Sequence, residues 1–333
     1  MWDFSLSRSF AMMIQTLPFI ILRLLVYIGI GIAYILAVGV GAVVGYGIGH
    51  FWSDTGAHAA GGFWGGLFGF GIVSAVLYLA REYLLYLVKA AHIAVLVQVL
   101  DGKPIPGGQN QVSYGADFVK THFAESSILF GVDQIIKGVL RVITGTLAAF
   151  TAFLPVPALQ TLVNIANSII RMSLTYVDEI ILAYLIRTQT TNPWDSAKDG
   201  LILYAQNYKH FLKNAVWLSI FMWVITIAIF ILLLGPATAI AYKFPGSAAL
   251  WAFGFAIIFA IALKKSLLEP LAIASLMQVY FKTIEGQTPD PQWEERLTTA
   301  SGKFRELAQK AAGWIPKAAG ASTPLPPVTK PAA

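Results

Sequence analysis

The hydrophobic positions of this chain form long unbroken runs, which alternate with shorter stretches of mixed polarity. The runs come in pairs separated by short turns, at residues 22–49 and 60–98, 127–153 and 157–187, and 214–242 and 247–282. Each run is longer than the roughly 20 residues that a helix needs to cross a bilayer. The pattern predicts about six transmembrane helices, arranged as three hairpins.

The stretches between the runs have helical periodicity with one apolar face. Three begin with Trp and an acid, at Trp2 (WDFSLSRSF), Trp194 (WDSAKDGLILYAQNYKHF) and Trp293 (WEERLTTASGKF); a fourth, QVSYGADFVKTHF, begins at Gln111. Amphipathic helices of this kind can lie in the membrane interface with Trp and Tyr at headgroup depth. The alternative is that they are cytoplasmic helices packed against protein.

These patterns divide the chain into eight segments. We expect an N-terminal amphipathic segment, a Gly-rich hairpin, an amphipathic segment, a second hairpin, an amphipathic helix, a third hairpin, another amphipathic helix and a disordered Pro/Ala-rich tail, at 1–21, 22–98, 99–126, 127–187, 188–213, 214–282, 283–315 and 316–333. The amphipathic segment recurs with each hairpin, so the chain has the character of an internal repeat.

Composition strengthens the membrane interpretation. Hydrophobic residues make up 57% of the 333 residues and charged residues only 12%. A soluble protein of this length cannot cover its surface with so few charges. The expected fold class is therefore an all-α integral membrane protein, and the expected partner is the lipid bilayer.

The distribution of basic residues predicts the orientation. The turns inside the hairpins, near His50, Leu154 and Tyr242, contain one basic residue, Lys243. The opposite loops and the tail carry Lys103, Lys120, Arg187, Lys198, Lys209, Lys213, Lys282, Arg296, Lys303, Arg305, Lys310 and Lys317. The positive-inside rule then places both termini in the cytoplasm of a multi-pass protein of the bacterial inner membrane. The same asymmetry explains the net charge of +6 without a nucleic-acid partner.

No motif for catalysis or cofactor binding is found in the sequence. There is no cysteine, and HExxH, Walker and GxSxG motifs are missing. His50, Asp54 and His58 share one turn, but their spacing matches no strong metal signature. We expect no catalytic residues, no metal and no cofactor, and therefore no enzyme.

The first hairpin carries a face of glycines on each helix. Gly41, Gly45 and Gly49 form GxxxGxxxG, and Gly61, Gly65 and Gly69 repeat it on the following helix. Small residues at this spacing let helix backbones approach closely in lipid. The simplest prediction is that the two faces pack against each other; a homo-oligomer contact or a pore-lining face are alternatives.

The second hairpin carries charges inside its predicted helices. Spacings of three and four place them in two polar stripes, Asp133, Lys137 and Arg141 on one helix and Asn164, Asn167, Arg171, Thr175 and Asp178 on the next. A charge at a helix centre costs about 2.5–3.5 kcal/mol to insert, so the stripes must face protein, water or a substrate. Either they form ion pairs, such as Arg171 with Asp133 or Arg141 with Asp178, or they line a route for a solute.

Further charges mark the other hairpins. Lys264, Lys265 and Glu269 lie on the cytoplasmic half of the last helix, and Pro270 should kink it and free a backbone carbonyl. Lys89, by contrast, is interpreted as the point where its helix enters the headgroup region.

Two stretches of the second half, VDEIILAYLIR from Val177 and LILYAQNYKHFLKNAV from Leu201, resemble the choline transporter-like family of membrane proteins. The resemblance covers about a third of the chain, and the two stretches occur in the reverse order. The resemblance implies passage of choline-like or ethanolamine-like cations, with Asp178 on a matching position.

Two functions follow from these patterns. The first is a secondary transporter or channel-like protein for a small polar or cationic solute, with the polar stripes as its route. The second is a non-catalytic scaffold or assembly protein that oligomerises through its glycine faces and organises lipid or partner proteins.

Overall fold

In the computed structural model, the described residues are 2–49, 55–105, 110–121, 130–140, 175–189, 191–243 and 247–315. All regular elements in these ranges are helices. Four are long: α2 (Leu17–Gly49), α3 (Thr55–Leu100), α9 (Tyr208–Lys243) and α10 (Ser247–Thr283). The shorter ones are α1 (Leu6–Gln15), α4 (Gln111–Thr121), α7 (Val177–Thr188), α8 (Pro193–Gln206), α11 (Pro291–Ala300) and α12 (Gly302–Ala312), and residues 130–140 are also helical.

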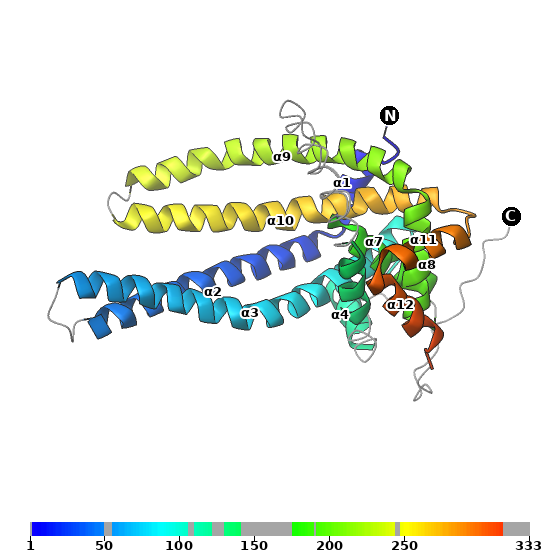
Figure 1. The fold of residues 1–333 in the computed structure, drawn as a ribbon. Helices are drawn as coiled ribbons and strands as arrows, with labels where there is room; N and C mark the ends of the chain where they lie inside the picture. Colours follow the sequence, from blue (N-terminus) through cyan, green and yellow to red (C-terminus); the bar gives the residue numbers. More distant parts are fainter. Residues whose placement is uncertain are drawn as a thin grey trace, which may run out of the picture.

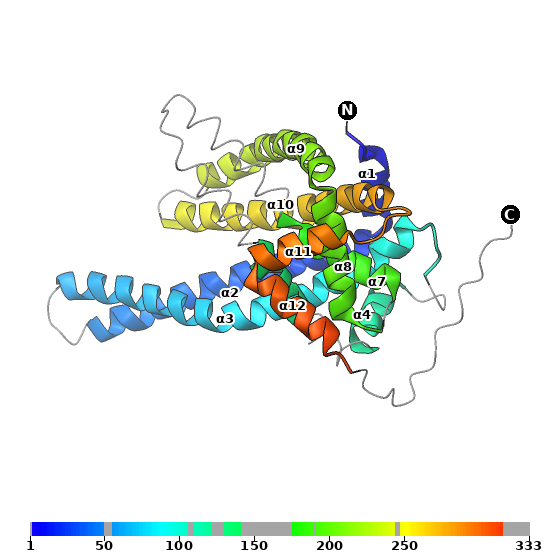
Figure 2. The same ribbon diagram turned by 45° about the vertical axis from the view of Figure 1, so that its right-hand side comes forward.

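The long helices form two antiparallel hairpins, α2 with α3 and α9 with α10, which extend in the same direction (Figure 1). The short helices gather at one end, where α2 begins and α3 and α10 end; we call this the compact end. Figure 2 shows α7, α8, α11 and α12 stacked against one another there. The architecture is all-helical throughout the described ranges.

Three stretches of the described helices are long and apolar enough to cross a bilayer: Leu17–Ile48, Tyr83–Leu100 and Tyr208–Leu232. The six spans expected from the sequence are not confirmed by these three. Their surroundings also differ. Residues Ile93 to Leu96 at the end of α3 are 0–1% exposed and belong to the protein core.

Exposed apolar side chains mark a different part of the helices, away from the compact end. They include Leu36, Val40 and Val43 on α2, Trp64 and Phe68 on α3, and Trp223, Phe230 and Leu232 on α9. Soluble proteins rarely expose contiguous apolar patches of this extent. These are the surfaces suited to contact lipid.

Glycines bring α2 and α3 together. A Cβ atom at Gly41 would collide with the carbonyl oxygen of Gly65, and one at Gly45 with that of Gly61. A Cβ at Gly69 would in turn meet the carbonyl oxygen of Ala37. The two glycine faces therefore pack against each other within one chain. For Gly49, the structure describes the backbone alone.

The stretch at 188–213 is not a single interfacial helix. Asn192 caps α8 by accepting hydrogen bonds from the backbone of Trp194 and Asp195, and α8 ends before Asn207. The next helix, α9, already begins at Tyr208. The interior of α8 is buried, with Leu201, Ile202 and Leu203 0–3% exposed, so α8 packs against protein as the alternative interpretation proposed.

The other amphipathic stretches also form helices. Trp293 lies in the first turn of α11, which is capped by Asp290 and begins with a proline, as α8 does. Ser301 ends α11 and caps α12. The two helices meet α8, where Lys198 Nζ lies 3.5 Å from Glu294 Oε1. Trp2 differs, because it precedes α1 and packs against Trp217 at a centroid distance of 5.2 Å.

Candidate functional site

A cavity of about 260 Å³ lies where α2, α3, α7, α10 and the helical residues 130–140 meet. Its walls are unusually rich in ionisable side chains. They include the cations Lys89, Lys137 and Lys265 and the carboxylates Asp133, Asp178, Glu179 and Glu269, with Tyr27 and Tyr86 between them. We call these residues and Arg23 the charged cavity.

Lys89 is the centre of one group of ion pairs. Its ammonium lies 2.9 Å from Glu179 Oε1 on α7 and 3.0 Å from Glu269 Oε1 on α10. The other oxygen of Glu269 accepts from Arg23 Nη2 at 2.5 Å and from the Tyr27 hydroxyl at 3.1 Å. These contacts connect four helices: α2 supplies Arg23 and Tyr27, α3 supplies Lys89, and α7 and α10 supply the two glutamates.

Lys137 is the centre of a second group. Its ammonium lies 2.7 Å from Asp133 Oδ2, one helical turn earlier, and 3.6 Å from Asp178 Oδ2 on α7. Asp178 and Glu179 occupy the first turn of α7, where the helix dipole favours negative charge. Successive residues on a helix point in different directions, so Asp178 faces Lys137 while Glu179 faces Lys89.

Arg23 is buried deeply, with 2% exposure, and is held from both sides. Besides Glu269, its guanidinium lies 3.4 Å from His92 Nδ1. The other nitrogen of His92 is 3.1 Å from Thr16 Oγ1, and Phe19 stacks on the imidazole ring at 5.1 Å. A buried charge with this many partners is stabilised by them, and removing one partner is expensive.

Two polar atoms on the wall of the charged cavity have no hydrogen-bond partner among the residues that the structure describes. They are Glu179 Oε2 and the hydroxyl oxygen of Tyr86, and both residues are only 5% exposed. Buried polar atoms nearly always have a partner, so each unpaired one calls for an explanation. A bound solute or water would supply the missing partner.

The predicted stripes of the second hairpin are only partly described. Asp133, Lys137 and Asp178 come together in the charged cavity, and Thr175 is exposed beside α7. Arg141, Asn164, Asn167 and Arg171 lie outside the described residues, as do the ion pairs expected for Arg141 and Arg171. Within the described part, Lys137 is the residue that joins the two stripes.

The sequence interpretation missed the roles of three residues. Lys89 was interpreted only as the point where its helix enters the headgroup region, whereas its ammonium is paired with two carboxylates of other helices. Arg23 was not singled out, although it is the lone charge in the apolar run of α2. Glu269 was noted, but its partners were not. The available signal was the rule that a charge inside an apolar helix needs a partner.

Neither the sequence motifs nor the described side chains indicate a metal centre. No three His, Cys, Asp or Glu side chains within the described ranges converge as metal ligands would. The turn with His50 and Asp54 lies outside those ranges, and nothing is described of the side chain of His58.

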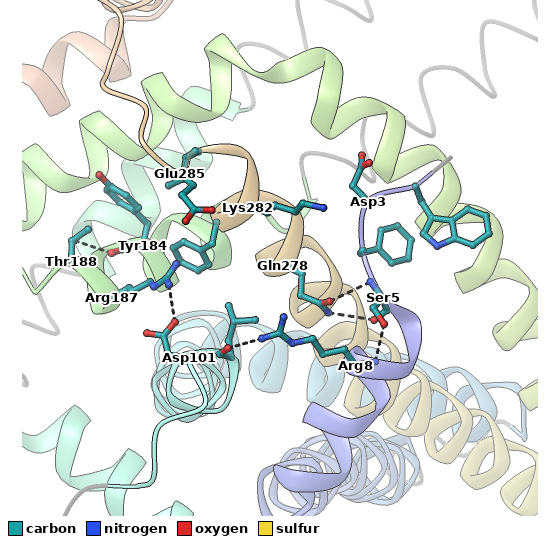
Figure 3. A pocket seen from close by; sticks show the side chains of 15 residues that line it. Asp3, Ser5, Arg8, Asp101, Tyr184, Arg187, Thr188, Gln278, Lys282 and Glu285 are labelled. Atoms are coloured by element: carbon teal, nitrogen blue, oxygen red, sulfur yellow. Dashed lines mark hydrogen bonds and ion pairs between the residues drawn. The ribbon is translucent and has the colours of Figure 1, made fainter. Parts of the chain in front are cut away.

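A larger, open cleft of about 800 Å³ lies at the compact end, between α1, the end of α3, α7 and the end of α10 (Figure 3). Its polar side chains include Arg8, Asp101, Arg187 and Lys282. It shares no lining residue with the charged cavity. We call it the compact-end cleft.

Comparison with protein-family models, curated proteins and solved structures found no match to this chain.

Proposed function

We propose that this chain is a secondary transporter or channel-like protein for a small polar, preferably cationic, solute in the bacterial cytoplasmic membrane. The charged cavity is the solute site. The observation that carries the proposal is the pair of unpartnered atoms, Glu179 Oε2 and the Tyr86 hydroxyl, on the wall of a cavity surrounded by apolar helices. Ionisable residues within membrane helices commonly mark solute and ion pathways.

The proposed topology has six spans, with both termini and the compact end in the cytoplasm. The α2–α3 and α9–α10 hairpins would supply four spans, and exposed apolar side chains on them support this. Residues 130–140 and α7 lie together, as the two ends of a further hairpin must. Basic residues such as Lys198, Lys209 and Lys303 belong to the compact end, as the positive-inside rule requires.

The chemistry of the charged cavity favours a solute that carries positive charge and donates hydrogen bonds. Glu179 Oε2 is a carboxylate oxygen, which accepts hydrogen bonds, and the Tyr86 hydroxyl can donate or accept. A cavity of 260 Å³ corresponds to about nine water molecules at roughly 30 Å³ each, so the solute must be small. The resemblance to choline transporter-like proteins suggests ethanolamine and choline as the first solutes to test.

The test is flux into proteoliposomes that contain the full chain. We expect labelled ethanolamine or choline to enter faster than into protein-free liposomes, and Glu179→Gln to reduce the rate at least about tenfold, because it removes the charge opposite the solute. Glu306→Gln is the matched control, since Glu306 lies on α12 away from the charged cavity. Absence of flux for both cations, or equal flux through Glu179→Gln, would contradict the proposal.

Tyr86→Phe separates a solute site from a structural role. The substitution removes a buried hydroxyl without a described partner, so the folded protein should keep or gain stability. The ring contact with Phe130, at a centroid distance of 5.4 Å, would remain. A solute that uses this hydroxyl should nevertheless bind more weakly, which raises the concentration for half-maximal flux. An unchanged value would remove the hydroxyl from the proposed site.

The second candidate function is a membrane scaffold or assembly protein, in which the ion pairs hold the helices together and no solute moves. The observation that favours it is that Lys89, Lys137 and Arg23 each pair with a carboxylate within the chain. The double variant Lys89→Met and Glu179→Gln distinguishes the two functions. A scaffold should keep its fold and its partners or oligomeric state, whereas a transporter should lose flux even though its fold is kept.

A further inference from the structure

The compact-end cleft has an excess of positive charge that the carboxylates of the described residues do not neutralise. Six charged side chains line it: Asp3, Arg8, Asp101, Arg187, Lys282 and Glu285. Counted alone, three cations and three carboxylates cancel. Their partners decide which of these charges remain available to a ligand.

Two of the carboxylates are already paired. Asp101 lies 2.8 Å from Arg187 Nη2 and 3.2 Å from Lys103 Nζ, and its side chain is only 8% exposed. Asp3 lies 2.7 Å from Lys213 Nζ. Both carboxylates are therefore neutralised by cations, two of which come from outside the wall of the cleft.

Two of the cations, by contrast, have no carboxylate partner in the part of the chain that the structure describes. Arg8 on α1 donates from Nη2 to the backbone oxygen of Leu100 at 2.8 Å, which leaves its other donors available. Lys282 on α10 takes part in no described ion pair. In the view of Figure 3, these two side chains lie on either side of Gln278. Glu285 is the one carboxylate of the cleft without a described ion pair.

We infer that the compact-end cleft binds a phosphate group, with Arg8 and Lys282 as its cationic contacts. Guanidinium and ammonium groups are the side chains that proteins use most for phosphate, and charge-assisted hydrogen bonds are the strong ones. Gln278 also lines the cleft, but its amide N–H groups already donate to Ser9 Oγ at 2.8 Å and to the Ala274 carbonyl oxygen at 3.1 Å, so the two cations are the contacts left for the phosphate. The volume of about 800 Å³ accommodates the group together with the molecule that carries it.

The phosphate could come from an anionic lipid headgroup or from a soluble phosphate ester. The surface around the cleft is compatible with either source of phosphate. The next turns of α1 expose Phe10 at 43% and Ile14 at 73%, which is the surface of a helix that lies against a bilayer. Basic pockets beside membrane helices on the cytoplasmic side commonly hold anionic headgroups. The cleft is also open to the solvent, so a soluble ester can enter it.

The test measures binding to the purified full chain in two arms. In the first, native mass spectrometry compares retention of phosphatidylglycerol with that of phosphatidylcholine. In the second, calorimetry in lipid-free detergent measures binding of glycerol 3-phosphate. Specific retention in the first arm identifies a lipid headgroup, and binding in the second alone identifies a soluble ester; either result supports the phosphate site. Failure of both arms overturns it.

Variants assign the binding to this cleft. Lys282→Gln and Arg8→Gln should each weaken binding at least about tenfold, because each removes a charge-assisted contact. Glu285→Gln should strengthen binding, because it removes the unpaired carboxylate. Lys303→Gln, the same change at an exposed position of α12 outside the cleft, should leave binding unchanged. Lys282 makes no described hydrogen bond, so its replacement leaves the fold intact; equal binding by Lys282→Gln and the wild type would overturn the inference.

Discussion

Asp3 and Asn214 exchange two hydrogen bonds across 211 positions of the chain. The backbone N–H of Asp3 donates to Asn214 Oδ1 at 2.7 Å, and Asn214 Nδ2 donates to Asp3 Oδ2 at 2.8 Å. The Asn214 side chain is fully buried. This exchange fastens the N-terminal segment to the first turns of α9.

We predict that Asn214→Ala lowers the free energy of unfolding by about 1–3 kcal/mol, because it leaves the partly buried Asp3 N–H without its acceptor. The measurement is thermal unfolding of the full chain in detergent, together with the rate of proteolysis near the N-terminus, which should rise. Lys209→Ala, at an exposed position in the first turn of α9, is the control and should change little. Unchanged proteolysis of Asn214→Ala would show that other contacts hold the N-terminal segment.

The same pair predicts a pH dependence of stability. Burial by itself raises the pKa of Asp3, but hydrogen bonds from Lys213 and Asn214 outweigh it, so the pKa lies below the ordinary value of 3.8. A lowered pKa in the folded state contributes stability above the unfolded-state pKa, and this contribution is lost as the pH falls through the folded-state pKa. The stability difference between wild type and Asp3→Asn should thus shrink as the pH falls below about 4. His210 Nε2 lies 3.1 Å from the same oxygen, so the comparison is made below pH 4, and a difference that grows there as the pH falls would have the wrong sign.

The glycine packing of α2 and α3 predicts opposite effects at neighbouring positions. Gly45→Ala would press a methyl group into the backbone of Gly61, so we expect destabilisation of at least about 1–3 kcal/mol. Gly47→Ala meets no atom within 4 Å and should be neutral or stabilising by up to about 1 kcal/mol through helix propensity. The unfolding midpoints of the two variants in detergent test this. Equal midpoints would mean that the close approach does not stabilise the hairpin.

The Arg23–Glu269 pair predicts a rescue. Arg23→Leu should destabilise by about 3–5 kcal/mol, because it removes one partner of a buried ion pair. Adding Glu269→Gln should recover part of this loss, since Lys89 keeps Glu179 as its partner. The yield of folded, monodisperse protein and its unfolding midpoint report the effect. A double variant that is less stable than Arg23→Leu would indicate that the two residues are not coupled through charge.

The helical architecture could be predicted because it depends on local pattern. The apolar runs that are long enough to cross a bilayer can be read from the sequence, and two of them form α2 and α9. The glycine spacing can be read in the same way, and the glycines that it picks out, such as Gly41 and Gly65, form the packing surface. The ends of elements were harder. The pattern of 195–213 continues through Asn207, but the side chain of Asn207 bonds instead to the Leu203 carbonyl at 2.9 Å, where α8 ends.

The partners of the charges could not be predicted, because they come from distant parts of the chain. Lys89 meets Glu179 and Glu269, which lie 90 and 180 positions away. Periodicity indicates which residues share a face of one helix, as it did for Asp133 and Lys137, but not which other helix that face meets. The compact-end cleft has the same origin, since Arg8 and Lys282 are brought together only by the fold.

Pro270 makes α10 easier to bend at one point than a helix of the same length without proline. Because proline has no N–H, the carbonyl of Ser266 loses its usual partner in the helix, and bending is easiest where that bond is missing. Glu269 immediately precedes this hinge and holds both Arg23 and Lys89. If the part of α10 before Pro270 tilted, Glu269 would move with it, and the distances to Arg23 and Lys89 would change. Bending at Pro270 would thus couple the position of this part of α10 to the ion pairs near the compact end.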